Sequence, residues 1–334
     1  MPAPRAQVAA LLLVLFSVPL RARAQASADS LPSGVLLREL ADSTLWPEGV
    51  DRDPRTGDFY VASVRHRTIV RASRDGTEHE LWPRDDRRFG AMLGVRVDPR
   101  RPVVWATTSG IPQMEGSIPG DSVIAALLRI DAHTGRILRR WDLPVAPRGH
   151  VLGDLAIGPR GDVYLTDSYH PVLYRLRPDA DTLEQITNPL FRSLQGMAPT
   201  ADGRFVYVAD YSRGLLRVRL ADGDVRRLAG VDTRGCDGIL LHRGAIVAVK
   251  NGTTPAGILR YVLNAAGDSI VATQLIDQNR VLAPEPTIGT MMGDRFVYVA
   301  NSQWEEYDDA GRLKPGAHLT RPRLVAVPVP RTSH

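Results

Sequence analysis

A short strand-like phrase recurs six times along the chain, and this repeat constrains the fold more than any other feature. Most copies begin with a turn containing glycine or aspartate and continue with four to six alternating or β-branched residues, as in 57–62. The other copies are 103–106, 161–165, 203–210, 244–249 and 293–300. Corresponding residues of successive copies, from Tyr60 to Tyr298, are 45, 59, 43, 40 and 51 residues apart. A period of this size indicates one repeated supersecondary unit.

Each copy has strand-like neighbours on both sides. A segment with a glycine near its start precedes five copies, at 48–50, 93–95, 153–155, 195–197 and 237–239. Another segment follows, at 68–70, 127–130, 173–176, 215–218 and 258–261, and most repeats carry a fourth, such as 137–141. No amphipathic helix of convincing length interrupts them. Four strands repeated six times predict an all-β fold, a six-bladed β-propeller with a central channel.

Spare strands at the two ends of the repeat array support closure of the ring. The segment 35–40 precedes the first repeat and 324–327 follows the last, so we expect both to share one blade. A β-sandwich or a solenoid would not require such a pair. Two insertions, 109–126 and 302–322, lengthen the second and sixth repeats, and long loops in compact folds are often functional. We expect at least one to cover the channel, and we expect the acidic and aromatic residues of 302–322 to form a solvated loop.

The first 24 residues have the layout of a secretory signal peptide. Arg5 is followed by an apolar run at 8–20 and by small residues at the two recognised positions of 22–24. The run is shorter than the roughly 20 residues of a membrane span, although an uncleaved anchor is the alternative. We therefore predict a signal peptide at 1–24, one propeller domain at 25–334, export to the periplasm or the extracellular space, and no membrane association after cleavage.

Charge and cysteine content exclude two classes of protein. Loss of 1–24 would remove three arginines and no acid, which leaves 39 basic and 37 acidic residues and a net charge of +2. The basic residues are scattered among acids, whereas nucleic-acid binders gather them on one face, so we predict no nucleic-acid partner. The single cysteine, Cys236, cannot form an internal disulfide, so a hydrophobic core must stabilise the protein.

Polar residues at the starts of the innermost strands form the candidate site. Because these strands line the channel, their first residues should meet at one mouth. The positions are Glu48, Leu93, Gly153–Asp154, Gln195, Asp237 and Thr287. Carboxylate and amide oxygens that converge from different blades suit hard cations such as Ca²⁺, Mg²⁺ or Mn²⁺. Simple turn caps are the alternative interpretation, because Asp-Gly is a common turn pair.

Four segments of the chain carry a resemblance to known proteins: 47–49, 153–156 followed by Gly161, 195–197 followed by 202–203, and 236–239. They are similar to the regucalcin/gluconolactonase (senescence-marker-protein-like) superfamily of six-bladed propellers, related to paraoxonases and strictosidine-synthase-like proteins. The resemblance implies a divalent metal at the channel mouth held by a Glu, two Asn and an Asp. Glu48 and Asp237 match the Glu and the Asp, whereas Gln195 and Gly153 stand at the Asn positions.

These observations lead to two functional hypotheses. The first is a metal-dependent hydrolase of a lactone or ester, with Glu48, Gln195, Asp237 and Asp154 as metal ligands. Ca²⁺ is the first candidate metal, with Mg²⁺, Mn²⁺ or Zn²⁺ as alternatives. Asp237 or Asp154 would act as general base, and His150 or His170 could shuttle protons. The second is a non-catalytic propeller that binds a small ligand or protein partner through its loop-bearing face, and a metal-free condensing activity is a minor third.

Overall fold

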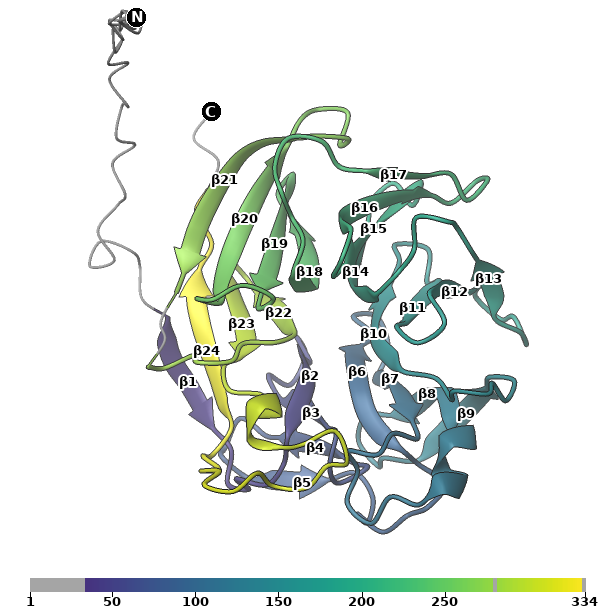
Figure 1. Cartoon of the computed structure of the whole chain (residues 1–334), viewed down its shortest axis with the longest axis vertical. Coiled ribbons are helices and arrows are strands. Elements are labelled where there is room, and N and C mark those ends of the chain that lie inside the picture. The colour runs from purple at the N-terminus through teal and green to yellow at the C-terminus, as the bar shows by residue number, and fades with distance from the viewer. Residues whose placement is uncertain (1–33, 279–280, 332–334) are drawn as a thin grey trace, which may run out of the picture. The chain divides into compact units, whose positions relative to one another are not determined.

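The predicted six-bladed β-propeller is confirmed. The computed structural model describes residues 34–278 and 281–331, so the predicted signal peptide at 1–24 lies outside the described residues. Six four-stranded antiparallel sheets are arranged in a ring, as Figure 1 shows. In the described residues the helices are two short 3₁₀ turns, η2 (Pro119–Val123) and η3 (Trp304–Glu306), one in each insertion. No helix in this part of the chain is long and apolar enough to cross a membrane.

Each of the first five blades is a meander of four consecutive strands. Blade 1 consists of β2 (Pro47–Arg52), β3 (Phe59–Ser63), β4 (Ile69–Ala72) and β5 (Glu78–Glu80). Blade 2 consists of β6 (Ala91–Val97), β7 (Val103–Ser109), β8 (Ala125–Asp131) and β9 (Ile137–Asp142). Blades 3 and 4 consist of β10 (Leu152–Ile157), β11 (Val163–Asp167), β12 (Val172–Leu176), β13 (Glu184–Ile186), and of β14 (Leu194–Pro199), β15 (Phe205–Asp210), β16 (Gly214–Arg219), β17 (Val225–Arg227). Blade 5 consists of β18 (Cys236–His242), β19 (Ala245–Lys250), β20 (Gly257–Leu263) and β21 (Ile270–Asp277).

Blade 6 closes the ring with strands from both ends of the described chain. Its order is β22 (Gly289–Met292), β23 (Arg295–Val299), β24 (Arg323–Pro328) and β1 (Val35–Glu39). Val35 pairs with Ala326, and Glu39 pairs with Arg323. The predicted pairing of the segments 35–40 and 324–327 is therefore correct, and it joins the beginning and the end of the domain by backbone hydrogen bonds.

The apolar side chains of the central strands are buried between neighbouring blades. In β3, Tyr60 and Ala62 pack against blade 2, whereas Phe59 and Val61 pack against blade 6. Successive side chains of a strand point to opposite faces, so a strand covered on both faces is apolar at every position. This explains why the repeated phrase is a continuous run rather than a strict alternation.

The innermost strands approach one another closely at a repeated irregularity. In each of the five strands β2, β6, β10, β14 and β18, the pairing register shifts by one residue near the start of the strand. Four of these bulges have glycine as their second residue, namely Gly49, Gly94, Gly196 and Gly238. A Cβ on Gly49 would lie 2.3 Å from the carbonyl oxygen of Leu93 on the next blade. The glycines thus permit backbone contact around the channel.

Substitution of Gly49 by alanine should destabilise the propeller. Overpacking of a rigid site costs about 1–3 kcal/mol, and here the obstacle is backbone that cannot rotate away. We expect Gly49→Ala to lower the free energy of unfolding by about that amount in denaturant titrations. Gly120→Ala is the matched control, since a Cβ there meets no atom within 4 Å. Equal stabilities of the two variants would contradict this account of the bulge.

Candidate functional site

Two of the predicted acids meet at one mouth of the channel through a shared hydroxyl group. Glu48 is the second residue of β2 on blade 1, and Asp237 is the second residue of β18 on blade 5. Thr287 lies between them, with its Oγ1 3.1 Å from Glu48 Oε1 and 2.9 Å from Asp237 Oδ2. A hydroxyl group has one proton and can donate to only one carboxylate at a time. The second short contact is therefore favourable only when that carboxyl group carries a proton of its own or the negative charge is otherwise neutralised.

Two further donors hold these carboxylates in place. The indole N–H of Trp304 donates to Glu48 Oε2 over 2.7 Å, and the Asn251 amide donates to Asp237 Oδ2 over 2.8 Å. The same Asn251 amide nitrogen also donates to the carbonyl oxygen of Pro286. Its carbonyl oxygen, Oδ1, is buried and has no hydrogen-bond partner among the described residues. Buried polar atoms normally have a hydrogen-bond partner. The unpaired amide oxygen of Asn251, beside the Asp237 carboxylate, therefore fits a cation or a hydrogen-bond donor bound at this position.

Burial makes the negative charge at this mouth costly. Burial raises the pKa of Glu48, and the charge of Asp237 raises it further. Burial also raises the pKa of Asp237, although hydrogen bonds from Thr287 and Asn251 oppose this effect. A third acid, Glu285, has its pKa raised to about 7 by burial and by the nearby charge of Glu305. The site thus favours protons or other positive charge near neutral pH.

The two positions where the resemblance expects Asn lie next to each other. A Cβ added to Gly153 would be 3.7 Å from Gln195 Oε1 and 3.5 Å from Ser168 Oγ. The Gln195 amide nitrogen has a long contact of 3.4 Å with Ser193 Oγ. No hydrogen bond among the described residues joins Gln195 to Glu48 or Asp237. Gln195 therefore presents its amide oxygen beside the space that the missing side chain of Gly153 leaves.

Asp154 occupies a different position from Glu48 and Asp237. It stands at the second residue of the bulge, where four other inner strands have glycine. Its Oδ2 lies 3.2 Å from the guanidinium group of Arg96, and its Oδ1 accepts a hydrogen bond from the Leu155 amide. Burial raises its pKa to about 6, although the charge of Arg96 opposes this shift. Its predicted roles as metal ligand and base stay predictions, and its contacts place it in an ion pair.

His150 is held by hydrogen bonds on both ring nitrogens. Its Nδ1 lies 2.5 Å from Asp167 Oδ2, and its Nε2 lies 2.8 Å from the carbonyl oxygen of Pro144. The hydrogen bond with Asp167 raises the pKa of His150. The predicted proton shuttle is not tested by this arrangement, which does not join His150 to Glu48 or Asp237. Cys236 is buried, and burial raises its pKa to about 11, which fits a core residue better than a nucleophile.

Both insertions pack beside the mouth. The Tyr307 ring stacks on Trp46 with centroids 3.9 Å apart, and the Trp304 ring meets Trp46 edge-on at 4.8 Å. Ile111 and Met114 of the other insertion belong to the same apolar cluster. The expectation that 302–322 is simply a solvated loop is therefore wrong for its aromatic residues. Their large apolar area is removed from water by packing on Trp46, while Glu305 and Asp309 remain exposed.

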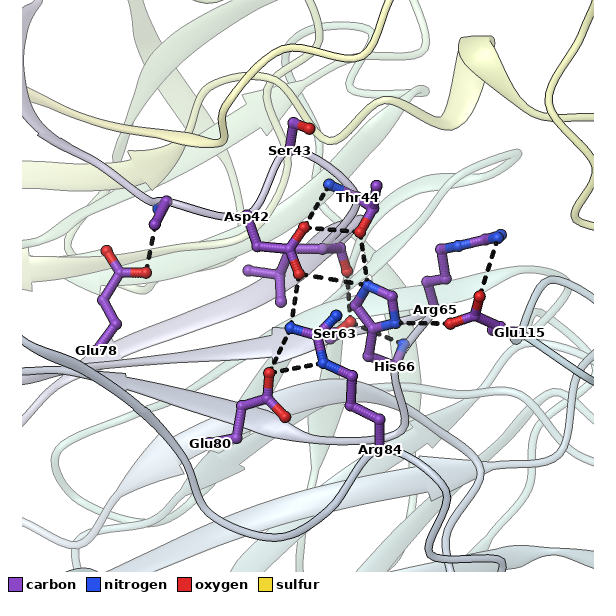
Figure 2. Close-up of polar contacts among 12 residues, drawn as sticks. Asp42, Ser43, Thr44, Ser63, Arg65, His66, Glu78, Glu80, Arg84 and Glu115 are labelled. Atoms are coloured by element: carbon purple, nitrogen blue, oxygen red, sulfur yellow. Dashed lines mark hydrogen bonds and ion pairs between the residues drawn. The ribbon is translucent and has the colours of Figure 1, made fainter.

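A polar cluster fastens insertion 109–126 to blade 1, as Figure 2 shows. His66 Nδ1 lies 3.1 Å from Glu115 Oε2, and its Nε2 lies 2.9 Å from Thr44 Oγ1. Asp42 continues the chain of contacts to Arg84, at 2.7 Å. Burial lowers the pKa of His66. The cluster fixes the loops around the mouth and brings no carboxylate into contact with Glu48 or Asp237.

Sequence reasoning missed two contributors to the site. Asn251 is not among the predicted site residues, yet it directly follows β19, the strand that pairs with the strand bearing Asp237. The position of Asn251 directly after β19, at the same mouth as Asp237, is the sequence signal that could have identified it as a site residue. The contact between Trp304 and Glu48 joins residues 256 apart in the chain, and no local pattern predicts it.

Comparisons with known proteins support the fold. No protein-family model matches the chain, and no curated protein matches its sequence. A gluconolactonase from Xanthomonas campestris is similar in structure, with a TM-score of 0.59 and 17% identity over 87% of this chain and 89% of that chain. A PQQ-bound aldose sugar dehydrogenase from Streptomyces coelicolor also has a TM-score of 0.59 and 17% identity, over 89% and 98%.

A third neighbour is virginiamycin B lyase from Staphylococcus aureus. Its TM-score is 0.54, with 16% identity over 78% of this chain and 80% of that chain. The predicted resemblance to gluconolactonases is thus confirmed as a likeness of fold. The names of the three neighbours describe three different activities, so this likeness does not define a function.

The raised pKa values predict how stability depends on pH. These acids have higher pKa values in the folded state than in the unfolded state, so folding strengthens their binding of protons. The folded state therefore loses stability as the pH rises from the ordinary carboxyl pKa to the raised one. For Asp154 and Glu285 this range is from about pH 4 to about pH 7. With a chelator present, the melting temperature should fall from about pH 5 to about pH 8. Glu48→Gln should make this fall smaller, because the amide needs no proton.

The exposed Glu39 provides the matched control for this measurement. Glu39→Gln should leave the pH dependence of the melting temperature unchanged. A Glu48→Gln curve that follows the parent protein at every pH would show that the mouth carboxylates titrate normally.

Proposed function

We propose that the protein is an exported, divalent-metal-dependent hydrolase that opens a lactone or an ester at this mouth of the channel. The observation that carries the proposal is the pair Glu48 and Asp237, bridged by Thr287, beside the unpaired amide oxygen of Asn251. Two buried acids in one group destabilise a fold unless a positive charge or a proton neutralises them. Such an arrangement is typical of functional sites.

The oxygen atoms present suit a hard divalent cation. Glu48 and Asp237 supply carboxylates, and Gln195 and Asn251 supply amide oxygens, which are the ligands that Ca²⁺ prefers. Gly153 supplies no side chain, so Asn251 would stand in for the amide that the resemblance expects there. A cation between these groups would neutralise the charge that burial makes unfavourable and give Asn251 Oδ1 the partner it lacks.

The side chains around the mouth have separable tasks in this reaction. A bound divalent cation would polarise the substrate carbonyl and lower the pKa of water. Asp237 Oδ1 accepts no hydrogen bond from another side chain among the described residues, so it is the oxygen placed to take a proton from attacking water. Thr287 and Trp304 orient the carboxylates, and the packed insertions limit access of bulk water to the site.

Fold neighbours favour lactones as the first substrates to test. The Xanthomonas campestris protein is described as a gluconolactonase, and a further neighbour is a putative gluconolactonase with a TM-score of 0.58 and 16% identity. The alternative, a non-catalytic propeller that binds a ligand through the same face, is favoured by the glycine at position 153.

Cation binding and hydrolysis provide the test. We expect calorimetry to detect binding of Ca²⁺, or else of Mg²⁺, Mn²⁺ or Zn²⁺, and we expect the bound cation to raise the melting temperature. At a hundredfold excess of cation over Kd, the free energy of unfolding should increase by about 2.7 kcal/mol. The double variant Glu48→Gln, Asp237→Asn should lose both the shift and the hydrolysis of sugar lactones, with a loss of rate of about 10²-fold or more. Asn251→Ala should weaken cation binding without preventing folding.

The exposed acids Glu39 and Asp309 supply the matched control pair. The double variant Glu39→Gln, Asp309→Asn carries the same change of charge and should keep both properties. Full lactonase activity in the mouth double variant would overturn the proposal. Absence of cation binding and of hydrolysis in the parent protein would favour the binding module.

A further inference from the structure

A cavity opens at the other end of the channel, away from Glu48 and Asp237. Its volume is about 550 Å³, within the range of about 300–1,000 Å³ for small-molecule sites. All six inner strands contribute to it near their ends, through residues 51–52, 96–97, 156–157, 197–199, 240–241 and 290–291. Asp51 lies three residues after Glu48 on β2, so the backbone positions of these two residues are about 10 Å apart.

The walls of this cavity are mainly apolar. Ile157, Leu240, Leu241 and Met291 line it and are only half-buried, and Met197 lies behind them in the core. These residues come from four different blades, and Leu240 and Leu241 are neighbours on the same strand. A concave apolar surface with a few polar groups is the usual form of a small-molecule site.

The charged groups of the cavity have an excess of positive charge. Arg52, Arg96 and Arg100 line it together with one acid, Asp51. The Asp51 carboxylate already accepts hydrogen bonds from the Val97 amide, at 2.7 Å, and from the Thr290 hydroxyl group. Both Asp51 oxygens are thus occupied by neutral donors, and among the described residues no ion pair joins this acid to the three arginines.

Two of these arginines lack a close carboxylate partner. Arg52 makes no ion pair among the described residues, and Arg100 donates to the carbonyl oxygen of Pro159, at 3.2 Å, with Asp98 at 3.9 Å. Many other surface arginines are paired within 3 Å, for example Arg88 with Asp86 and Arg234 with Asp232. Guanidinium groups that lack a close carboxylate partner and lie beside a concave apolar wall are available to an external anion.

The Arg96–Asp154 ion pair joins the wall of this cavity to the bulge of β10. Arg96 donates to the carbonyl oxygens of Val50 and Val95 as well as to Asp154, and both charged side chains are almost fully buried. Asp154 is the second residue of the β10 bulge, whereas Ala156 and Ile157, further along the same strand, line the cavity. Arg96 is thus the member of the pair that lines the cavity.

We propose that this cavity binds a small amphipathic anion, an apolar body that carries a carboxylate. The apolar walls would cover the body, and Arg52 and Arg100 would hold the carboxylate at the rim through charge-assisted hydrogen bonds. Inorganic phosphate or sulfate would leave the walls uncovered, and a cationic ligand would meet three arginines. The inference goes beyond the hydrolase proposed above, because it concerns a second site, at the other end of the channel.

Calorimetric titration with decanoate, below its micellar concentration, tests this proposal, with decanol as the neutral probe. We expect saturable binding of decanoate and at least tenfold weaker binding of decanol. The double variant Arg52→Gln, Arg100→Gln should weaken decanoate binding at least tenfold. The double variant Arg192→Gln, Arg213→Gln removes the same charge from two exposed arginines that do not line the cavity, and it should bind as the parent does.

Met291→Glu is a second variant, which places a carboxylate on the half-buried wall of the cavity. We expect it to prevent binding of decanoate. Its melting temperature should stay close to that of the parent protein. Equal binding of decanoate and decanol, or unchanged binding in the Arg52, Arg100 variant, would overturn the proposal, as would absence of binding to the parent. Glu48→Gln should bind decanoate normally, so failure of this site and failure of the proposed hydrolase are distinguishable.

Discussion

The structure depends on the close approach of its innermost strands. Each of these strands touches the inner strands of both neighbouring blades, and the contact is backbone against backbone at the bulges. Gly238, for example, would place a Cβ 2.9 Å from the Cα of Ile288 on the next blade. A ring built in this way has little freedom, because a shift at one blade must be taken up by the others. The residues just before the bulge glycines, among them Glu48 and Asp237, are therefore fixed on a rigid framework.

The third inner strand, β10, departs from this rule at its bulge. Asp154 replaces the bulge glycine, and its carboxylate needs a partner in a place from which water is largely excluded. Arg96 of the neighbouring blade supplies this partner, with its guanidinium group 3.2 Å from Asp154 Oδ2. Breaking a buried ion pair by removing one partner is strongly destabilising, so each of these residues depends on the other. Arg96 also lines the cavity at the far end of the channel, so this buried ion pair connects the wall of that cavity to the bulge of β10.

Much of this arrangement could be predicted from the sequence, because it repeats. The six strand phrases, the terminal strands that close blade 6 and the positions of Glu48, Asp237 and Thr287 all follow from a period that the ring imposes on the chain. What could not be predicted depends on single contacts outside that period. Trp304 reaches Glu48 from an insertion, and Asn251 reaches Asp237 across a strand pair. The packing of Tyr307 on Trp46 likewise joins distant segments whose composition alone indicated a solvated loop.

The mouth carries an energetic cost that the fold itself does not require. Leu93 occupies the corresponding position on blade 2 and is buried in an apolar cluster, which shows that this position can be filled without charge. Glu48 and Asp237 instead bury two acids that raise each other's cost of ionisation, and Thr287 can donate to only one of them at a time. Structural explanations such as turn capping account for one carboxylate beside backbone amides, not for two acids that face a common hydroxyl group from different blades. A neutralising partner is the simplest physical reason for an arrangement that is otherwise unfavourable.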